Sequence, residues 1–259
     1  MEIKNHHILI TGANRGIGRA VALMCAEDGA HLHLVTRSAD AGLKNDCVKA
    51  GAASVQLYQV DLGSRAEITA FIDKMHHQEI DILFNNAGQL TGGLLEDQPI
   101  DEIYSMLQVN LNAVIQLTHG LLPQMLKRKK GKIINNSSVS GVMNMPCAST
   151  YSAAKTAVVA FSNCLRNELG GTGVSVLVLL TPGIETRMFD DIPKKYGKNL
   201  DLSFLEKSLS PKEYSQMIRE AILMDLQILK PSGVTGIGML MAQHIPAAFN
   251  KLIAKKFSR

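Results

Sequence analysis

Short runs of β-branched residues and leucine alternate along this chain with longer stretches in which apolar residues recur at helical spacing. This alternation is typical of a parallel sheet whose two faces are covered by helices. The apolar runs predict strands at residues 8–10, 31–35, 55–60, 80–84, 131–135 and 174–180. The periodic stretches predict helices at residues 15–28, 39–50, 65–77, 100–127 and 150–169. We therefore expect an α/β fold with one doubly wound parallel sheet of about seven strands.

The regular alternation ends after residue 188, where proline and glycine separate shorter helical pieces. We interpret residues 188–210 as a flap beside a binding site and residues 239–259 as a C-terminal tail helix. Both belong to one domain of 259 residues, which a single core can support. One stripe of the tail helix carries Phe249, Leu252, Ile253 and Phe257, with lysines beside it. We expect this stripe to pack on the chain itself or on a second subunit; contact with an anionic membrane surface is the alternative.

Composition narrows the class of protein. The net charge of +4 is mild and the cations are scattered, so no nucleic-acid partner is expected; the run from Lys127 to Lys130 suits a helix C-terminus. The four cysteines form no CxxC pair and have no histidine at ligand spacing, which predicts reduced thiols and no metal site. No export signal is visible, and the longest strongly apolar run, residues 174–180, is too short to span a membrane. We expect a cytoplasmic protein.

A glycine-rich turn follows the first predicted strand. Gly12, Gly16 and Gly18 stand in TGANRGIG, between that strand and a helix start. Glycines there let backbone N–H groups and the positive end of the helix approach a pyrophosphate. The spacing is GxxxGxG rather than GxGxxG, and a turn that merely packs a helix on a strand is the alternative. Its place at the first strand of an alternating chain favours a dinucleotide.

The end of the second predicted strand indicates which dinucleotide. Folds that prefer NAD usually place an acid there for the ribose 2′-hydroxyl, and an arginine accommodates the 2′-phosphate of NADP. Here the strand ends Val35-Thr36-Arg37-Ser38, with no acid at the turn. Arg37 and Arg15 would bracket that phosphate, whereas the alternative is that both are solvated surface arginines. The sequence therefore favours NADP(H).

A tyrosine and a lysine four residues apart supply the candidate chemistry. Tyr151 and Lys155 fall on the same side of the helix predicted at residues 150–169. Reduction of a ketone requires a proton for its oxygen, and a cation beside the phenol is expected to lower the tyrosine pKa toward a useful range. A lone YxxxK is common, so its context matters. Thirteen residues upstream, the fifth strand ends at Ser138, whose hydroxyl would donate a hydrogen bond to the substrate oxygen.

Together these motifs resemble the short-chain dehydrogenase/reductase family over roughly residues 6–188. TGANRGIG resembles its cofactor turn, Asn85-Asn86-Ala87-Gly88 its NNAG turn, and Asp61 its contact to the adenine ring. The resemblance implies a single Rossmann-type domain with helices on both faces of the sheet. It also implies a homodimer or homotetramer, formed through the helices at residues 100–127 and 150–169.

The resemblance also assigns roles to individual residues. It implies the catalytic set Asn110, Ser138, Tyr151 and Lys155. Ser138 is preferred to its neighbours Ser137 and Ser140, and Asn110 would sit at a helix irregularity and hold a water that links the lysine to solvent. It implies cofactor contacts from Gly12, Asn14, Arg15, Gly16, Ile17, Gly18, Arg37, Asp61, Leu62, Asn86, Ala87, Gly88, Tyr151, Lys155, Pro182, Gly183, Ile184 and Thr186. Thr186 would be the side-chain contact to the nicotinamide carboxamide.

Three functions follow from this set. The first is an NADP(H)-dependent oxidoreductase that reduces a ketone or aldehyde to an alcohol, reversibly. The second is a 3-oxoacyl thioester reductase of fatty-acid type, which would share the site but commonly lacks such a tail. The third is a non-enzymatic NADP(H)-binding sensor or scaffold, which is disfavoured because the chain keeps the whole catalytic set.

Substrate identity is expected in residues 89–95 and 141–147 and in the flap. These segments contain the soft or apolar side chains Met143, Met145, Cys147, Met188 and Phe189. They suit an apolar carbonyl compound, although methionines also pack helices in many proteins.

Overall fold

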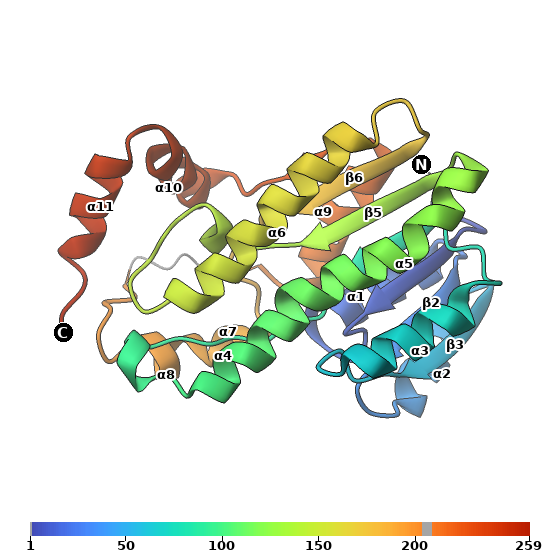
Figure 1. Cartoon of the computed structure of the whole chain (residues 1–259), viewed down its shortest axis with the longest axis horizontal. Helices are drawn as coiled ribbons and strands as arrows, with labels where there is room; N and C mark the ends of the chain where they lie inside the picture. The colour runs from blue at the N-terminus through green and yellow to red at the C-terminus, as the bar shows by residue number, and fades with distance from the viewer. Residues whose placement is uncertain (1, 204–208) are drawn as a thin grey trace.

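The computed structural model describes residues 2–203 and 209–259. Within these residues lies a parallel sheet of seven strands in the order β3-β2-β1-β4-β5-β6-β7 (Figure 1). The strands are β1 His7–Thr11, β2 His31–Thr36, β3 Ser54–Gln59, β4 Ile82–Asn85, β5 Gly131–Asn136, β6 Val174–Leu179 and β7 Ile228–Leu229. The predicted doubly wound Rossmann-type α/β fold is confirmed. The two-residue β7 is too short to leave a periodic signal, and sequence reasoning did not locate it.

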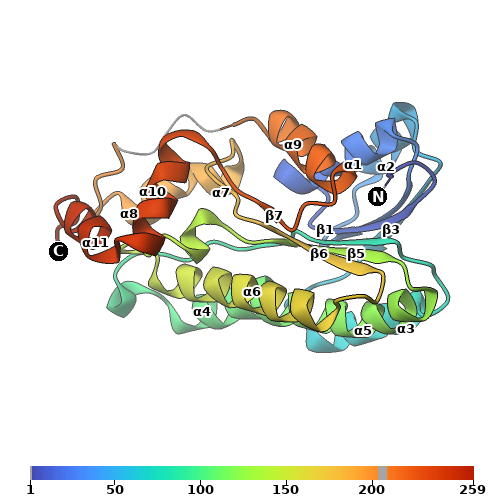
Figure 2. The same ribbon diagram turned by 90° about the horizontal axis from the view of Figure 1, so that it is seen from above.

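Helices cover both faces of the sheet (Figure 2). One layer holds α1 Gly16–Glu27, α2 Ala41–Ala50 and α9 Pro211–Leu223; the other holds α3 Arg65–Met75, α4 Ile100–Leu107, α5 Ala113–Arg128 and α6 Ser149–Glu168. Successive strand residues point to opposite faces, so that Ile10 and Phe84 pack under the first layer and Leu9 and Leu83 under the second. Burial on both faces explains why the strands inside the sheet read as largely apolar runs, whereas the edge strand β3 is partly exposed.

The strand order creates a crevice between β1 and β4. From β1 the chain continues to β2 on one side, and from β4 it continues to β5 on the other side. The connections that leave the carboxyl ends of these two neighbours therefore diverge, and ligands bind at such a switch point in open α/β sheets.

The stretch predicted as one helix at residues 100–127 is continuous but irregular. α4 ends at Leu107, a wider π-helical turn spans Gln108–Asn112, and α5 follows to Arg128. Such a turn contains an extra residue, which a 3.6-residue period cannot reveal. The basic run does end this helix, with Lys129 in the left-handed conformation at its C-cap (φ 52°).

The tail consists of two helices, which corrects the single helix predicted at residues 239–259. α10 begins earlier, at Gly233–His244, and α11 covers Pro246–Ala254. Pro246 has no backbone N–H and restricts the residue before it, so Ile245 takes φ −135° and ψ 58° and breaks the helix. Phe257 consequently lies beyond α11.

Short elements complete the fold around the crevice. Two of them, α7 Arg187–Asp190 and α8 Ile192–Tyr196, lie in the predicted flap, of which residues 204–208 fall outside the described residues. Two 3-10 turns span Leu95–Asp97 and Val139–Gly141. Among the described residues, no helix is both long enough and apolar enough to cross a membrane.

Candidate active site

The glycine turn is shaped so that only glycine fits. Gly12 and Gly16 have φ values of +65° and +54°, and a Cβ on Gly18 would lie 2.3 Å from the carbonyl oxygen of Gly12. The N-cap of α1 is Arg15, whose side chain makes no capping hydrogen bond. The N-cap side chain therefore leaves the first N–H groups of α1 to another acceptor, which fits a pyrophosphate at this helix N-terminus.

Polar side chains at the strand ends connect this turn to its neighbours. Asn86 Nδ2 donates to the carbonyl oxygen of Thr11 (2.9 Å), and the backbone N–H groups of Asn86 and Ala87 donate to Thr11 Oγ1 (2.9 and 3.0 Å). Asn136 Nδ2 donates to Asn86 Oδ1 (3.0 Å), and Thr181 Oγ1 donates to Asn136 Oδ1. These bonds hold together the carboxyl ends of β1, β4, β5 and β6. Sequence reasoning gave Thr11, Asn136 and Thr181 no such role, because nothing in their spacing shows which strand ends are neighbours.

A cleft of about 1330 Å³ opens above these strand ends. Most of the residues predicted to contact the cofactor line it, from the glycine turn, the strand ends and the segment after β6. They are Gly12, Asn14, Arg15, Gly16, Ile17, Arg37, Asp61, Leu62, Asn86, Ala87, Gly88, Tyr151, Lys155, Pro182, Gly183, Ile184 and Thr186. Gly18 does not line the cleft, because it lets α1 pack against the turn; its contact with the cofactor stays a prediction.

Two arginines lie at one end of the cleft. In the part of the chain that the structure describes, neither Arg15 nor Arg37 forms an ion pair, and Arg37 is exposed at the end of β2. Thr186 packs against the glycine turn, because a Cβ added to Gly16 would lie 3.0 Å from the methyl group of Thr186. The structure thus brings the end of β2, the glycine turn and the segment after β6 to one cavity.

The catalytic candidates Ser138, Tyr151 and Lys155 line the same cleft and are 9%, 8% and 4% exposed. Lys155 Nζ donates to the carbonyl oxygen of Asn136 (2.8 Å) and lies 5.7 Å from the centroid of the tyrosine ring. Ser138 is hydrogen-bonded to the phenol, whereas Ser137 Oγ donates away from it, to the carbonyl oxygen of Lys155 (2.8 Å). This geometry favours Ser138 over Ser137.

Burial controls the acidity of this pair. Burial raises the pKa of Tyr151 to about 12, and its hydrogen bond with Ser138 opposes the rise. Burial lowers the pKa of Lys155 to about 8. The expected lowering of the tyrosine pKa by Lys155 is therefore not what this structure shows: desolvation of the enclosed phenol outweighs the cation.

Asn110 lies behind the cleft rather than in its wall. It sits in the π-helical turn, is 1% exposed, and brackets Gln89 by donating to its carbonyl oxygen (2.9 Å) and accepting from its N–H (2.7 Å). The expected helix irregularity is confirmed, and a Cβ on Gly88 would lie between Asn110 and Lys155, at 3.5 and 3.8 Å. The water link to the lysine stays a prediction.

The other end of the cleft is apolar. Met143, Met145, Met188 and Phe189 line it as expected, whereas Cys147 is buried in a separate small core and does not. Sequence reasoning missed the side chains that the tail contributes, namely Met241, Phe249, Leu252 and Ile253. The sequence shows the helical stripe that contains Phe249, Leu252 and Ile253, but it does not show that this stripe faces a cavity. No cluster of His, Cys, Asp or Glu able to hold a metal ion occurs in residues 2–203 and 209–259.

A family model described as short chain dehydrogenase matches residues 6–197. The chain belongs to the short-chain dehydrogenase family. The matched part contains the glycine turn and the tyrosine–lysine pair, and the tail lies beyond it. The chain is therefore an oxidoreductase of a family that uses a nicotinamide cofactor.

Relatives within the family extend this similarity. An uncharacterized oxidoreductase of Staphylococcus saprophyticus is 33% identical over 224 residues, which cover 85% of this chain and 91% of that protein. The ketoacyl reductase HetN of Nostoc sp. is 34% identical over 176 residues, covering 66% of this chain and only 61% of that protein.

Solved structures share the fold. A short-chain dehydrogenase from Streptomyces avermitilis superimposes with a TM-score of 0.80 at 24% identity, covering 98% of this chain and 97% of the other. A proposed NAD(P)-dependent gluconate 5-dehydrogenase from Beutenbergia cavernae, with NADP bound at low occupancy, gives a TM-score of 0.78 at 22% identity, covering 88% and 95%. At these identities the likeness concerns the fold alone.

Proposed function

We propose that this short-chain dehydrogenase is an NADP(H)-dependent oxidoreductase that reduces a ketone or aldehyde to an alcohol, reversibly. The observation that carries the proposal is that Ser138, Tyr151 and Lys155 line the same cleft as the glycine turn. Proton chemistry and dinucleotide binding would therefore take place in one cavity.

The chain's own residues would manage the proton and the oxygen. Tyr151 would donate its phenolic proton to the substrate oxygen, and Ser138 would donate a hydrogen bond to the same oxygen. Lys155, held by the carbonyl oxygen of Asn136, would favour the phenolate that remains. Asn110 would hold a water on the path that returns a proton to this pair. When bound, the nicotinamide would supply or accept the hydride.

NADP(H) is the proposed form of the cofactor. Arg15 and Arg37 line the cleft and are not engaged in ion pairs within the described residues. A guanidinium presents several N–H donors in one plane, which suits a phosphate dianion. The second strand ends without an acid that would select the 2′-hydroxyl of NAD.

A second candidate activity is reduction of a 3-oxoacyl thioester. The Nostoc relative is named as a ketoacyl reductase, which favours this activity. Both activities use the same proton donor, so the substrate alone separates them.

The test is NADPH oxidation by the purified protein with a panel of ketones, aldehydes, quinones and a 3-oxoacyl thioester. Turnover of simple ketones or aldehydes, lost in Tyr151→Phe, supports the main proposal. Turnover of the thioester alone supports the second. Tight NADPH binding with no turnover of any member would favour a sensor or scaffold and would overturn both.

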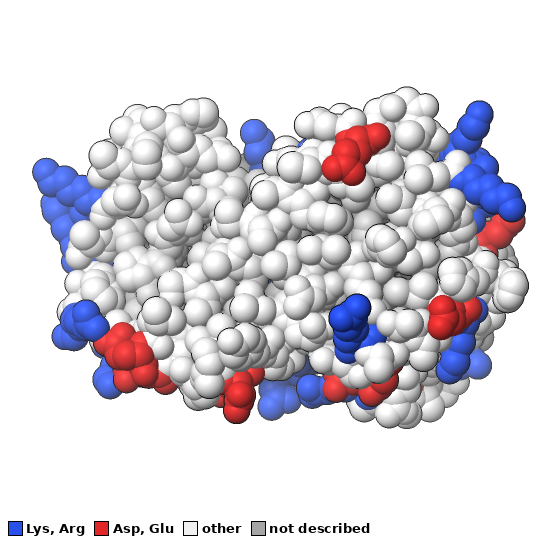
Figure 3. All heavy atoms as spheres, viewed as in Figure 1, with Lys and Arg blue, Asp and Glu red and all other residues white. Residues whose placement is uncertain are grey.

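We also propose a homodimer or homotetramer built through α5 and α6, in the cytoplasm. Figure 3 shows that the surface over these two helices carries few charged side chains, which suits a subunit contact. The free thiols Cys25, Cys47, Cys147 and Cys164 fit a reducing compartment. Sedimentation equilibrium of the full chain tests the oligomer, and a monomer at micromolar concentration would contradict it.

A further inference from the structure

The tail reaches back to the cavity that contains the proposed chemistry. Met241 from α10 and Phe249, Leu252 and Ile253 from α11 line the same cleft as Tyr151. Phe249 and Ile253 are only 3% and 5% exposed, although α11 lies at the far end of the molecule from the N-terminus (Figures 1 and 2). The buried side of the tail therefore belongs to the wall of the cleft.

The end of the tail is fastened to the flap. Residues 256–258 run antiparallel to residues 199–201: the N–H of Asp201 donates to the carbonyl oxygen of Lys256, and the N–H of Ser258 donates to that of Asn199, both at 2.8 Å. Lys256 Nζ also donates to the Asp201 carboxylate at 2.8 Å. We call this pairing the latch. It fixes α11 at its C-terminal end over the cleft.

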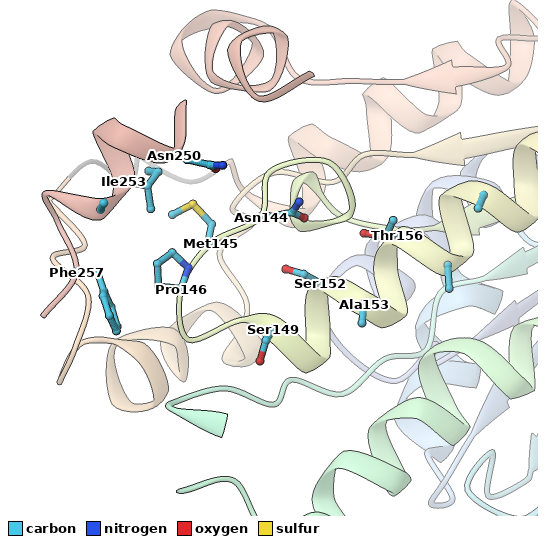
Figure 4. Close-up of a pocket in the computed structure, with 13 residues that line it drawn as sticks. Asn144, Met145, Pro146, Ser149, Ser152, Ala153, Thr156, Asn250, Ile253 and Phe257 are labelled. Carbon is cyan, nitrogen blue, oxygen red and sulfur yellow. The ribbon is translucent and has the colours of Figure 1, made fainter. Parts of the chain in front are cut away.

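On its other side α11 does not pack closely on α6. A hollow of about 800 Å³ separates them, and its wall on the side of α6 consists of small side chains such as Ser149, Ala153 and Thr156 (Figure 4). Met145 and Ile253 belong to the walls of both this hollow and the cleft. α11 is thus held by its cleft-facing side chains and by the latch.

The lining at this end has the character of a hydrocarbon site. Apolar side chains come from four separate segments, for example Leu90, Met143, Met188, Phe189, Phe249 and Ile253. Of the charged residues in this part of the lining, Asp191 and Lys256 form ion pairs with Lys194 and Asp201, and Arg187 and Lys230 also line the cleft. A hydrocarbon chain would be desolvated against these side chains at little cost, because they offer few groups that need hydrogen-bond partners.

We propose that α10 and α11 form the far wall of the substrate site, and that the substrate is an extended, mainly hydrocarbon ketone or aldehyde. Its carbonyl lies at Tyr151 and its chain lies against Phe249 and Ile253. The inference rests on the proposed carbonyl chemistry and adds to it the class of substrate and the residues that select it.

The experiment compares straight-chain methyl ketones, from 2-butanone to 2-dodecanone, with saturating NADPH. Each added methylene that reaches the apolar wall is expected to raise kcat/KM about fourfold, the ratio set by burial of one CH₂. Ile253→Ala is expected to raise KM about tenfold for the longest ketones, with little change in kcat and none for 2-butanone. Ile237→Ala is the matched control, because Ile237 is in the same tail, 62% exposed, and not part of the wall.

A second variant covers the case in which Ile253→Ala loosens the tail. Met241→Phe adds bulk to the same wall and is expected to shorten the preferred ketone by two or more carbons while 2-butanone is still turned over. A flat response to chain length in the wild type, or equal losses at every length in Ile253→Ala, overturns the role of the tail.

A different result is expected if the proposed carbonyl chemistry is wrong but the tail does form the wall of the site. In that case no ketone would be turned over, but binding of 2-dodecanone would still raise the Tm of the wild type more than that of Ile253→Ala. Absence of both turnover and this shift in Tm overturns the inference as well.

Discussion

The amino ends of the parallel strands form one edge of the sheet and their carboxyl ends form the other. Both edges carry polar side chains, but the partners of these side chains differ. At the amino edge the polar groups bond to one another: His7 and His33 share a hydrogen bond of 3.0 Å, His33 bonds to Tyr58 at 3.2 Å, and the fully buried Lys132 pairs with Asp225. At the carboxyl edge, Arg15, Arg37, Tyr151 and Lys155 instead face a cleft.

The difference follows from how the chain leaves each edge. Connections diverge where the strand order reverses between β1 and β4, which leaves a crevice at the carboxyl ends. Polar groups there are available to a ligand, whereas those at the amino edge serve stability. Substitutions at the carboxyl edge should therefore change activity, and those at the amino edge should change only the free energy of unfolding.

The largest effect is expected at Tyr151. Tyr151→Phe removes only the proton-carrying hydroxyl, so kcat should fall by about 10²–10⁴-fold while the Kd of NADPH stays within about twofold. Steady-state kinetics and fluorescence titration of NADPH measure the two quantities. Tyr104→Phe is the control, since Tyr104 is 67% exposed and should keep full activity. Full activity in Tyr151→Phe would show that Tyr151 is not the proton donor.

The next effect concerns the choice of cofactor. Arg37→Ala should lower kcat/KM for NADPH by about 10–100-fold and leave that for NADH unchanged, because a charge-assisted hydrogen bond contributes about 1.5–3 kcal/mol. Arg65→Ala, at an exposed arginine outside the cleft, should leave the ratio of the two values unaltered. An unchanged ratio in Arg37→Ala would show that the residue is a solvated surface arginine.

A smaller, pH-dependent effect is expected from Lys155. Because burial lowers its pKa to about 8, the ammonium should be lost as the pH rises through that value. We expect kcat/KM for carbonyl reduction to fall about tenfold between pH 7 and pH 9. In Lys155→Arg the cation persists, so the alkaline decline should move to higher pH even where the rate is reduced. A decline at the same pH in this variant would assign it to another group.

At the amino edge no effect on kcat is expected, only one on stability. Burial lowers the pKa of His33 to about 4, so between pH 6.5 and pH 4 the unfolded chain binds a proton that the folded chain does not. The free energy of unfolding should therefore decrease as the pH falls, by about 2 kcal/mol from pH 8 to pH 5.

Urea denaturation at both pH values measures this decrease. His33→Gln should reduce it, and His77→Gln, at an exposed histidine outside the proposed subunit contact, should not. A loss of kcat at pH 8 in a folded His33→Gln protein would contradict the expectation that substitutions at the amino edge change only stability.

Local patterns explain why much of the site was predictable. TGANRGIG, the NNAG turn and the Tyr151–Lys155 spacing each lie within a few residues, and backbone geometry alone places such neighbours on one turn or one helix face. The longer strands inside the sheet were predictable because burial on both faces requires a largely apolar run, and only the edge strand β3 among the six longer ones is partly exposed.

Features that depend on distant segments were not predictable in this way. The extra residue of the π-helical turn at Asn110 leaves the apolar pattern intact, and residues 239–259 were predicted as one helix although Pro246 divides them. The raised pKa of Tyr151 depends on how completely the fold encloses the phenol, which the neighbouring Lys155 could not indicate.

Local spacing and periodicity are enough to predict the α/β fold, the family and the residues that would carry the chemistry. What the tail faces depends on the three-dimensional arrangement of the chain. Phe249 and Ile253 are more than ninety residues from Tyr151 in the chain, and they reach its cleft because the latch binds residues 256–258 to residues 199–201. Such a contact between distant segments leaves no mark on the hydrophobic pattern of either one.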